Sequence, residues 1–304
     1  MSSSREPAVG IDLGTTYSAA AYVDGAQRPS TLANMEGDKL TPSVVLFEGN
    51  ETVVGKEAAR ALSTNAEQVA ECVKRCLGQR LYPKSLSGRQ FPPEALQAFI
   101  LHKIRRDAQQ QIGVFERAVI TVPAYFDEVR RKSTQDAGYI AGLEVLDIIN
   151  EPTAAALAYA YQQGVLGQPI TSDFENILVY DLGGGTFDVT VMEVGGGQYT
   201  TLATDGDVHL GGWDWDQRFV DHVAELCIRR VGIDPRQDQN LAGRLWRVCE
   251  EAKRTLSARA AATIVFVVHG ESLKVEVTRD EFQGLTQDLL DRTAFTTRQT
   301  LQAA

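Results

Sequence analysis

Apolar positions along the first half of the chain alternate between strand-like and helix-like spacing. Short runs that are continuous or alternate every second residue predict strands at Val9–Asp12, Tyr17–Val23, Pro42–Glu48, Ala118–Val122 and Leu146–Ile149. Longer segments with helical periodicity predict helices at Asn65–Leu77, Pro93–Ile112, Glu128–Ala141 and Thr153–Gln163. Because strands and helices alternate, the sequence predicts an α/β protein.

The second half begins the opening pattern again. A stretch that carries Gly, Pro, Ser and Asp together, Gly164–Glu175, is interpreted as the connection between two lobes. The predicted strands after it are the hairpin Ile177–Val194, Tyr199–Asp205, and a hairpin of Ala262–Val268 and Leu273–Val277 around His269-Gly270. The predicted helices are Asp214–Val231, Leu241–Leu256 and Arg279–Gln302.

The repeated segment has the same plan in both halves. An apolar strand leads into Asp-Leu-Gly at Asp12 and again at Asp181, and a Gly/Thr turn then leads into a second strand. The two copies are one whole lobe apart, so the pattern indicates duplication of a domain and excludes a solenoid repeat.

This repeated turn has the composition of a phosphate site. Successive backbone N–H groups of a tight turn can face phosphate oxygens, and the hydroxyls of Thr15, Thr16 and Thr186 add donors. Glycine is expected because phosphate approaches the backbone closely and because such a turn can require positive φ. Asp12 and Asp181 would repel bare phosphate, but each could hold the waters of one shared Mg²⁺.

Three alternatives compete with this interpretation. A single Asp-Gly would be read as an ordinary hairpin turn, and the second matching copy argues against that reading. The stretch Gly49–Glu57 resembles a P-loop but has one residue too many between its glycines, and Glu57 stands where Ser or Thr should hold Mg²⁺. No Gly-x-Gly-x-x-Gly opens a helix, which argues against a dinucleotide fold.

Composition narrows the function further. The 304 residues are 43% hydrophobic and 23% charged, as in soluble proteins of about two domains. A formal charge of −10 argues against nucleic-acid binding. No apolar stretch is long enough to cross a membrane. The four cysteines form no Cys-x-x-Cys pair, although Cys72 and Cys76 would share a helix face, and they fit a reducing cytoplasm.

Longer stretches resemble one family. The repeated hairpin resembles the actin-like superfamily, which includes sugar kinases, actins and 70-kDa heat-shock (DnaK-type) chaperones. The stretches that look like the ATPase domain of these chaperones are Gly10–Ser18, Val122–Phe126, Asp136–Tyr159, Asp181–Val189, Gly206–Asp214 and Glu250–Ser257. Val-Pro-Ala-Tyr-Phe together with Gly-Asp-Val-His-Leu-Gly-Gly separates this family from bacterial actins.

The resemblance implies a fold and its divisions. It implies two duplicated actin-like (ribonuclease H-like) lobes, with inserted subdomains, around a nucleotide cleft. Lobe I would span residues 1–172, with its core at 1–40 and 115–172 and an insertion at 41–114. Lobe II would span 173–304, with its core at 173–212 and 288–304 and an insertion at 213–287. The family continues with a Gly-Gly-x-x-Arg turn that is not found here, so we expect lobe II to be incomplete and the adenine site open on one side.

The resemblance also implies ATP or ADP, Mg²⁺ and a candidate K⁺ as ligands, with roles for particular residues. Catalytic roles fall on Lys74, which would reach the γ-phosphate, and on Glu151, Asp181, Thr186 and Asp188. The metal would be held through water by Asp12, Asp181 and Glu151. Nucleotide contacts fall on Asp12, Gly14, Thr15, Thr16, Tyr17, Gly183, Gly184, Gly185, Thr186, Gly211, Gly212, Glu250, Lys253, Arg254 and Ser257.

The residues expected to contact the nucleoside also have a regular spacing in the sequence. Glu250, Lys253, Arg254 and Ser257 fall on one face of a predicted helix, opposite an apolar face. Without the resemblance, this spacing indicates an amphipathic surface helix with a solvated polar side. With it, Lys253 and Arg254 would flank the adenine, while Glu250 and Ser257 would bond the ribose and the ring.

Partners and competing functions complete the predictions. The resemblance implies a J-domain co-chaperone and a nucleotide exchange factor, with Pro123 and Arg131 coupling the cleft to such partners. A monomer is expected. The main functional prediction is slow, Mg²⁺-dependent ATP hydrolysis by the nucleotide-binding domain of a chaperone. Two alternatives stay open, an actin-like filament subunit and a non-catalytic nucleotide sensor.

The sequence departs from the family at Trp213, where an acid is usual, and in the short span from Gln79 to Arg89.

Overall fold

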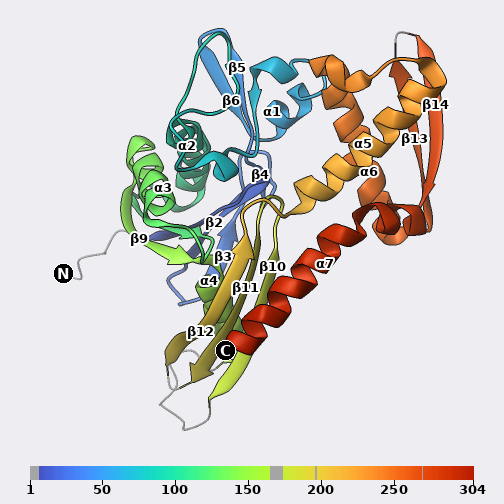
Figure 1. Cartoon of the computed structure of the whole chain (residues 1–304). Coiled ribbons are helices and arrows are strands. Elements are labelled where there is room, and N and C mark those ends of the chain that lie inside the picture. Colours follow the sequence, from blue (N-terminus) through green and yellow to red (C-terminus); the bar gives the residue numbers. More distant parts are fainter. Residues whose placement is uncertain (1–6, 165–173, 196, 269) are drawn as a thin grey trace.

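The chain folds into two lobes joined near their centre, as the computed structural model shows (Figure 1). The structure describes residues 7–164, 174–195, 197–268 and 270–304. Lobe I is drawn in blue and green, and lobe II in yellow, orange and red. Most of the predicted connection, residues 165–173, and His269 of the second predicted hairpin lie outside the described residues.

The core of lobe I is a mixed sheet in the order β3-β2-β1-β8-β9, with β4 also paired to β2. Its strands are β1 (Val9–Leu13), β2 (Tyr17–Val23), β3 (Pro29–Leu32), β4 (Thr41–Pro42), β8 (Arg117–Val122) and β9 (Glu144–Asn150). Strands β1, β8 and β9 are parallel, and β1 and β2 form an antiparallel hairpin. One continuous apolar core joins this sheet to α2 (Pro93–Ile112) and α3 (Glu128–Ile140).

A smaller sheet in the order β6-β5-β7 forms the outer part of lobe I. It consists of β5 (Val45–Glu48), β6 (Glu51–Val54) and β7 (Val69–Ala70), and it is accompanied by α1 (Lys56–Ala61) and the 3-10 turns η1 (Ala66–Gln68) and η2 (Val73–Cys76). The predicted helix Asn65–Leu77 is therefore wrong. Val69 and Ala70 pair with β5, and Cys72 has a left-handed backbone with φ of 53°, so tertiary pairing overrides the helical pattern here.

Lobe II contains a three-stranded antiparallel sheet, β10-β11-β12, with β10 (Glu175–Leu182), β11 (Phe187–Gly195) and β12 (Gln198–Asp207). Its outer part is made of α5 (Gly212–Val231), η3 (Pro235–Gln237), α6 (Gln239–Ala258), β13 (Ala261–Val268) and β14 (Glu271–Thr278). The last helix, α7 (Arg279–Ala303), runs from this outer part down along β11 and β12 (Figure 1).

The predicted boundary between residues 287 and 288 falls inside α7, which is one continuous helix. This helix packs on α5 and β14 at one end of its course and on β11 and β12 at the other. The outer part and the sheet of lobe II are therefore joined by a rigid element. The other predicted domain boundaries stay predictions.

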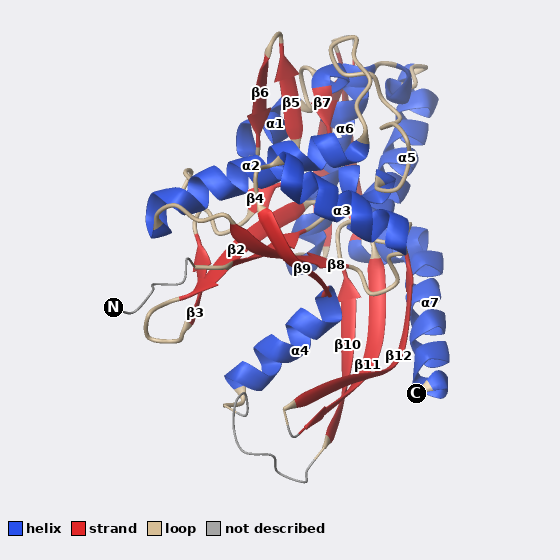
Figure 2. Cartoon of the chain, turned by 90° about the vertical axis from the view of Figure 1, so that its left-hand side faces the viewer, coloured by secondary structure: helices blue, strands red, loops and turns tan. Residues whose placement is uncertain are grey.

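Helix α4 (Glu151–Gln162) connects the two lobes in space. It follows β9 directly and contacts β8 and β9 of lobe I together with β10 and β11 of lobe II. Figure 2 shows α4 beside the lower strands, on the side away from α7. The predicted strand Pro42–Glu48 is divided between two sheets, since Thr41–Pro42 pairs with β2 and Val45–Glu48 belongs to the smaller sheet. Apart from this strand and Asn65–Leu77, the predicted strands and helices are confirmed to within a few residues. Among the described helices, none is both long and apolar enough to cross a membrane.

Candidate functional site

The two Asp-Leu-Gly hairpins have equivalent geometry. In lobe I, Asp12 pairs with Ala19 and Leu13 with Ser18 across the hairpin. In lobe II, Asp181 pairs with Asp188, and Leu182 with Phe187. Each aspartate thus stands one residue before the end of its first strand, and the glycine-rich turn follows at once. The duplication predicted from the sequence is present in the strand register.

The turns of the two hairpins meet each other directly. A Cβ atom added to Gly184 would overlap Thr16, and one added to Gly185 would overlap Thr15. Neither glycine, nor Gly14 or Gly183, has positive φ, so these turns form without it. Gly184 and Gly185 are needed because the threonines of the opposite hairpin pack against their backbone.

Charged groups from both lobes converge beside these turns. A cavity of about 430 Å³ opens there. It is lined by Asp12, Gly14, Thr15, Thr16, Tyr17, Lys74, Thr121, Glu151, Ala154, Ala155, Asp181, Gly183, Gly184 and Thr186. Lys74 comes from the turn η2 and is only 4% exposed, and its Nζ lies 2.5 Å from Glu151 Oε1. The structure therefore brings the predicted lysine, metal-holding carboxylates and phosphate turns into one cavity.

Burial and mutual repulsion raise the pKa of the carboxyl groups in this region. Burial raises the pKa of Glu151, the Lys74 ammonium opposes that rise, and Asp12 and Asp181 add to it. The pKa of Asp181 is raised by burial, with Lys74 opposing and Asp12 adding a smaller rise. Burial, followed by the charges of Glu151 and Asp181, raises the pKa of Asp188 to about 8. Such a group of carboxylates is stabilised by a nearby cation.

The donor set fits a metal ion held through water. Within the described ranges, no group of three or more His, Cys, Asp or Glu side chains is arranged to ligate a metal directly. Asp12, Asp181 and Glu151 nevertheless line one cavity and repel each other electrostatically. Mg²⁺ keeps several of its waters and needs few direct protein ligands, so these three oxygen donors suit it.

Asp188 lies behind the cavity and contributes no surface to its lining. Its side chain is buried, and its Oδ1 accepts a hydrogen bond from the Ala124 N–H at 3.2 Å. Arg131 donates to the carbonyls of Ala124 and Phe126 and to Asn150 Oδ1. A continuous series of bonds thus runs from Asp188 through the loop after β8 to Arg131 at the start of α3. Pro123 is buried in that loop.

The polar face of α6 lies over a second cavity of about 370 Å³, next to the phosphate turns. Lys253 Nζ donates to the Gly212 carbonyl at 3.0 Å and to Asp216 Oδ2 at 2.7 Å. Burial raises the pKa of Asp216 to about 6, although Lys253 opposes the rise. Arg254 donates to Glu250 Oε1 at 2.5 Å and to Tyr17 Oη of lobe I at 3.1 Å.

Some predicted contact residues lie outside these two cavities. Gly185 and Gly211 are buried and pack on each other, and a Cβ atom on Gly211 would lie 2.6 Å from Gly185 N. Ser257 is exposed, one turn beyond Arg254, and lines neither cavity. Gly185 and Gly211 are thus placed to support the turn, while Gly212 lines the second cavity.

The comparisons with known proteins agree on one family. The sequence model of the Hsp70 protein family matches residues 8–86 and 83–304. The chaperone protein DnaK of Halobacterium salinarum is 43% identical over 306 residues, covering 98% of this chain and 47% of the relative. DnaK of Thermosipho melanesiensis is 40% identical over 315 residues, covering 100% of this chain and 51% of the relative.

This chain belongs to the Hsp70 family. The family resemblance seen in the sequence is thereby confirmed, and with it the mixed α/β fold of two actin-like lobes. DnaK of Thermotoga neapolitana gives the same picture, with 41% identity over 313 residues. The chain spans about half the length of these curated relatives.

Sequence reasoning missed several residues of this Hsp70 site. Arg75 donates to the Gly185 carbonyl at 2.7 Å and pairs with Asp214, so it ties the outer part of lobe I to the lobe II turn. Thr121 donates to Asp12 Oδ1 at 3.2 Å. Arg75 was adjacent to the predicted Lys74, and Thr121 lies directly before the Val-Pro-Ala-Tyr-Phe stretch, so position next to a motif was the only available signal.

Trp213 departs from the family pattern, and the structure gives it a partner. Its ring lies 4.8 Å from the ring of Trp246 on α6, and the Arg75 guanidinium lies 5.2 Å from the Trp213 ring. An aromatic pair therefore occupies the position where an acid is usual.

The predicted helix face shared by Cys72 and Cys76 is absent, because these residues belong to the irregular segment around η2.

Proposed function

We propose that this chain is the nucleotide-binding domain of an Hsp70-type chaperone and that it binds and slowly hydrolyses ATP with Mg²⁺. One observation carries the proposal. Two equivalent Asp-Leu-Gly turns from separate lobes meet at one cavity, where a buried Lys74–Glu151 pair stands beside them. A phosphate chain in this cavity would be surrounded by backbone and hydroxyl donors from both lobes.

The chemistry asked of the protein is positioning and charge stabilisation. In hydrolysis, a water oxygen forms a bond to the γ-phosphorus while the bond to the bridging β–γ oxygen breaks. Lys74, held by Glu151, would offset negative charge that develops on the transferred group. Thr186, Thr15 and Thr16 would orient phosphate oxygens through their hydroxyl groups. Mg²⁺, when bound, supplies further neutralisation of the phosphate charge.

The nucleoside would occupy the second cavity, beneath α6. Its lobe I side includes Tyr17 and Glu71. Its lobe II side includes Gly212, Trp246, Glu250, Lys253 and Arg254. Because Arg254 bonds Tyr17 across the cleft, a base placed here would lie against a bridge between the two lobes. Residues of both lobes would then sense whether the nucleotide is present.

A further part of the proposal concerns coupling to partners. The bonds from Asp188 through Ala124 to Arg131 link the region of the phosphate cavity to the surface of α3. We include a J-domain co-chaperone and a nucleotide exchange factor among the partners on the basis of family membership. A cytoplasmic location has the same basis.

Turnover of Lys74 variants tests the catalytic proposal. Lys74→Ala and Lys74→Met should lower single-turnover hydrolysis by about 100-fold while changing ATP affinity much less, since the lysine acts on charge that develops in the transition state. Lys132→Ala is the matched control, because Lys132 is 62% exposed and its contacts, to Asp136 and the Tyr139 ring, lie within its own helix. Folding of each variant is checked by circular dichroism.

Three results would contradict this assignment. Equal turnover in the Lys74 variants and the parent would remove Lys74 from the mechanism. Binding of ATP without any phosphate release in the parent would exclude an ATPase and select the nucleotide-sensor alternative. ATP-dependent, reversible sedimentation of the chain would select the filament alternative.

A further inference from the structure

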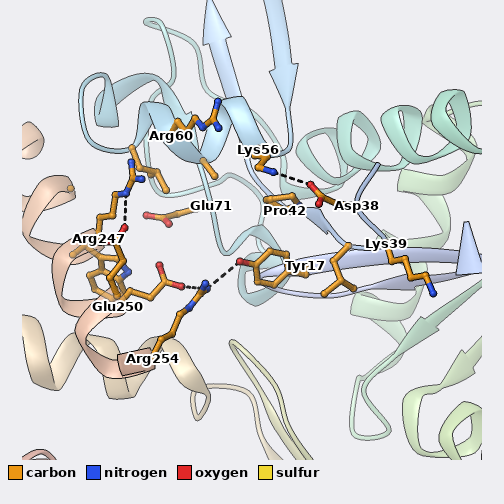
Figure 3. A pocket seen from close by; sticks show the side chains of 16 residues that line it. Tyr17, Asp38, Lys39, Pro42, Lys56, Arg60, Glu71, Arg247, Glu250 and Arg254 are labelled. Atoms are coloured by element: carbon orange, nitrogen blue, oxygen red, sulfur yellow. Dashed lines mark hydrogen bonds and ion pairs between the residues drawn. The ribbon is translucent and has the colours of Figure 1, made fainter. Parts of the chain in front are cut away.

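A third cavity lies between the outer parts of the two lobes and is the largest of those described here, about 760 Å³ (Figure 3). The loop before β4, together with α1, contributes one side, and α6 contributes the other. Its volume falls within the range of about 300–1,000 Å³ that is common for small-molecule sites. None of the phosphate-turn glycines or threonines lines it.

The positive side chains around this cavity are largely neutralised by their neighbours. Lys56 pairs with Asp38 at 3.1 Å, and Arg254 with Glu250 at 2.5 Å. In the same way, Arg247 pairs with Glu251 at 3.2 Å, and Arg60 with Glu57 at 2.6 Å. Lys39 points away from the cavity in Figure 3. The basic groups therefore supply little positive charge that is free to hold an anion.

Glu71 is the acidic group in this cavity that is left without a partner. Its side chain reaches into the cavity in Figure 3 and is half-buried. Among the residues that the structure describes, none forms a hydrogen bond or ion pair with its carboxylate. Lys84 is a nearby cation, but its ammonium is bound to the carbonyls of Ala66 and Val69. A half-buried carboxylate in this position is stabilised by an added positive charge.

Burial raises the pKa of Glu71, the charge of Lys84 opposes the rise, and the charge of Glu250 adds to it. The raised pKa of Glu71 agrees with the geometry, because both show that the nearby cations offset only part of the cost of burying the carboxylate charge. The unpaired carboxylate and its raised pKa both indicate that the cavity would bind a positively charged ligand more tightly than a neutral one.

The rest of the lining is suited to an apolar group. Trp246, Leu62, Ala59, Pro42 and Leu40 contribute apolar surface around Glu71. An indole can pack against a flat apolar group and can also attract a cation through its ring face. The cavity thus offers one unpaired carboxylate within a largely apolar wall.

We propose that this cavity binds a small organic cation, an amine or amidinium that carries an apolar group, with Glu71 as its charge partner and Trp246 as part of its apolar wall. The cavity is lined by residues of both lobes, and such a ligand would hold their outer parts together. This cavity adjoins the second one, and the Arg254 bridge to Tyr17 and Glu250 borders both. Both cavities are lined by Tyr17, Pro42, Ala59, Leu62, Glu71, Trp246, Glu250 and Arg254, whereas Leu40 and Arg247 line only the third.

Benzamidinium is a suitable probe, because its planar amidinium can donate two hydrogen bonds to one carboxylate and its ring is flat. Calorimetry and protein NMR would compare it with benzamide and benzoate, which have the same shape but are neutral and negative. Benzamidinium should bind at least about tenfold more tightly than either, which corresponds to ~1.4 kcal/mol. Equal affinity for benzamide would overturn the proposal.

A pair of variants locates the site. Glu71→Gln keeps the shape of the side chain and should weaken benzamidinium by about tenfold while leaving benzamide unchanged. Glu48→Gln is the matched control, since Glu48 is an exposed carboxylate at the end of β5 in the same small sheet. Glu71→Gln with unchanged benzamidinium affinity would place the cation elsewhere.

Saturation with ADP and Mg²⁺ separates this site from the proposed nucleotide site. Benzamidinium should still bind to the saturated protein, and its NMR shifts should include Leu40 and Arg247, which line the third cavity and not the second. Complete displacement by ADP would show that the probe occupies the nucleotide cavity, which contradicts a distinct site. The benzamidinium titrations without nucleotide do not depend on ATP binding. They would therefore still test this cavity if the proposed ATPase function were wrong.

Discussion

The two hairpins share their register but lie in different surroundings. Strand β1 lies between β2 and β8, whereas β10 is at the edge of its sheet and, among the described strands, pairs only with β11. Val9 and Ile11 of β1 are 0% and 1% exposed, and the residues at the corresponding positions of β10, Leu178 and Tyr180, are each 44% exposed. The same local motif thus lies on one strand whose apolar face is buried and on one whose apolar face is partly uncovered.

This difference separates the geometry of the phosphate turn from the packing of its sheet. Gly184 and Gly185 are fixed by contact with Thr16 and Thr15 of the opposite lobe, and the width of the lobe II sheet does not enter that contact. Asp12 additionally receives a bond from Thr121 on the neighbouring strand. For Asp181, the described residues provide no bond of that kind. Lobe I should therefore contribute more to stability, while both turns contribute to binding.

The largest expected effect is on the stability of lobe I. Ile11→Ala should lower the free energy of unfolding by about 2–5 kcal/mol, because it leaves a cavity in a packed core. Leu178→Ala on the uncovered face of β10 should cost less than about 1 kcal/mol. Urea unfolding of both variants measures the contrast. Similar losses would show that the β10 face is covered in solution.

The second effect concerns the contact between the turns. Gly184→Ala places a Cβ atom against Thr16 and should separate the turns, which would weaken ATP binding by about 10- to 100-fold, the equivalent of ~1–3 kcal/mol. Gly25→Ala is the control, since a Cβ atom there meets nothing within 4 Å. Calorimetric titration of both variants measures the difference. Unchanged affinity in Gly184→Ala would mean that the turns do not need to meet for binding.

Local features were predictable from the sequence, and features set by residues distant in the chain were not. Both hairpins and the polar face of α6 were predicted because residues close in the chain determine them. The predicted helix Asn65–Leu77 failed because β5, far away in the sequence, pairs with Val69 and Ala70. The packing of Gly184 and Gly185 was not predicted for the same reason, since their close neighbours are threonines of the other lobe. Ser257 followed the correct helical spacing but lies beyond the end of the cavity.

A pH dependence should distinguish the crowded carboxyl groups of the cleft from ordinary ones. Burial, and then Glu151 and Asp181, raise the pKa of Asp188 to about 8, against about 4 in an unfolded chain. The folded state therefore binds this proton more tightly, and the free energy of unfolding should fall by about 1–2 kcal/mol as pH rises from about 6 to about 8. Asp188→Asn should flatten this slope in urea unfolding of the protein without nucleotide. A slope that persists in the variant would assign it to another group.

The smallest effect is a gain in stability in lobe II. Gly284 is exposed inside α7, and a Cβ atom there would meet nothing within 4 Å. Gly284→Ala should raise the free energy of unfolding by about 0.5–1 kcal/mol through helix propensity. If α7 stabilises the narrow sheet of lobe II, the melting temperature of that lobe should rise. A decrease would show that position 284 faces a contact.

The most direct test of the central claim is a calorimetric titration with ATP, with and without Mg²⁺, of the parent, Asp12→Asn and Asp181→Asn. The account predicts one site per chain, tightened by Mg²⁺ in the parent. Each variant should lose most of that tightening and retain the metal-free affinity, because the two aspartates hold the waters of one ion from opposite lobes. Absence of ATP binding to the parent, or an equal loss of both affinities in either variant, would contradict it.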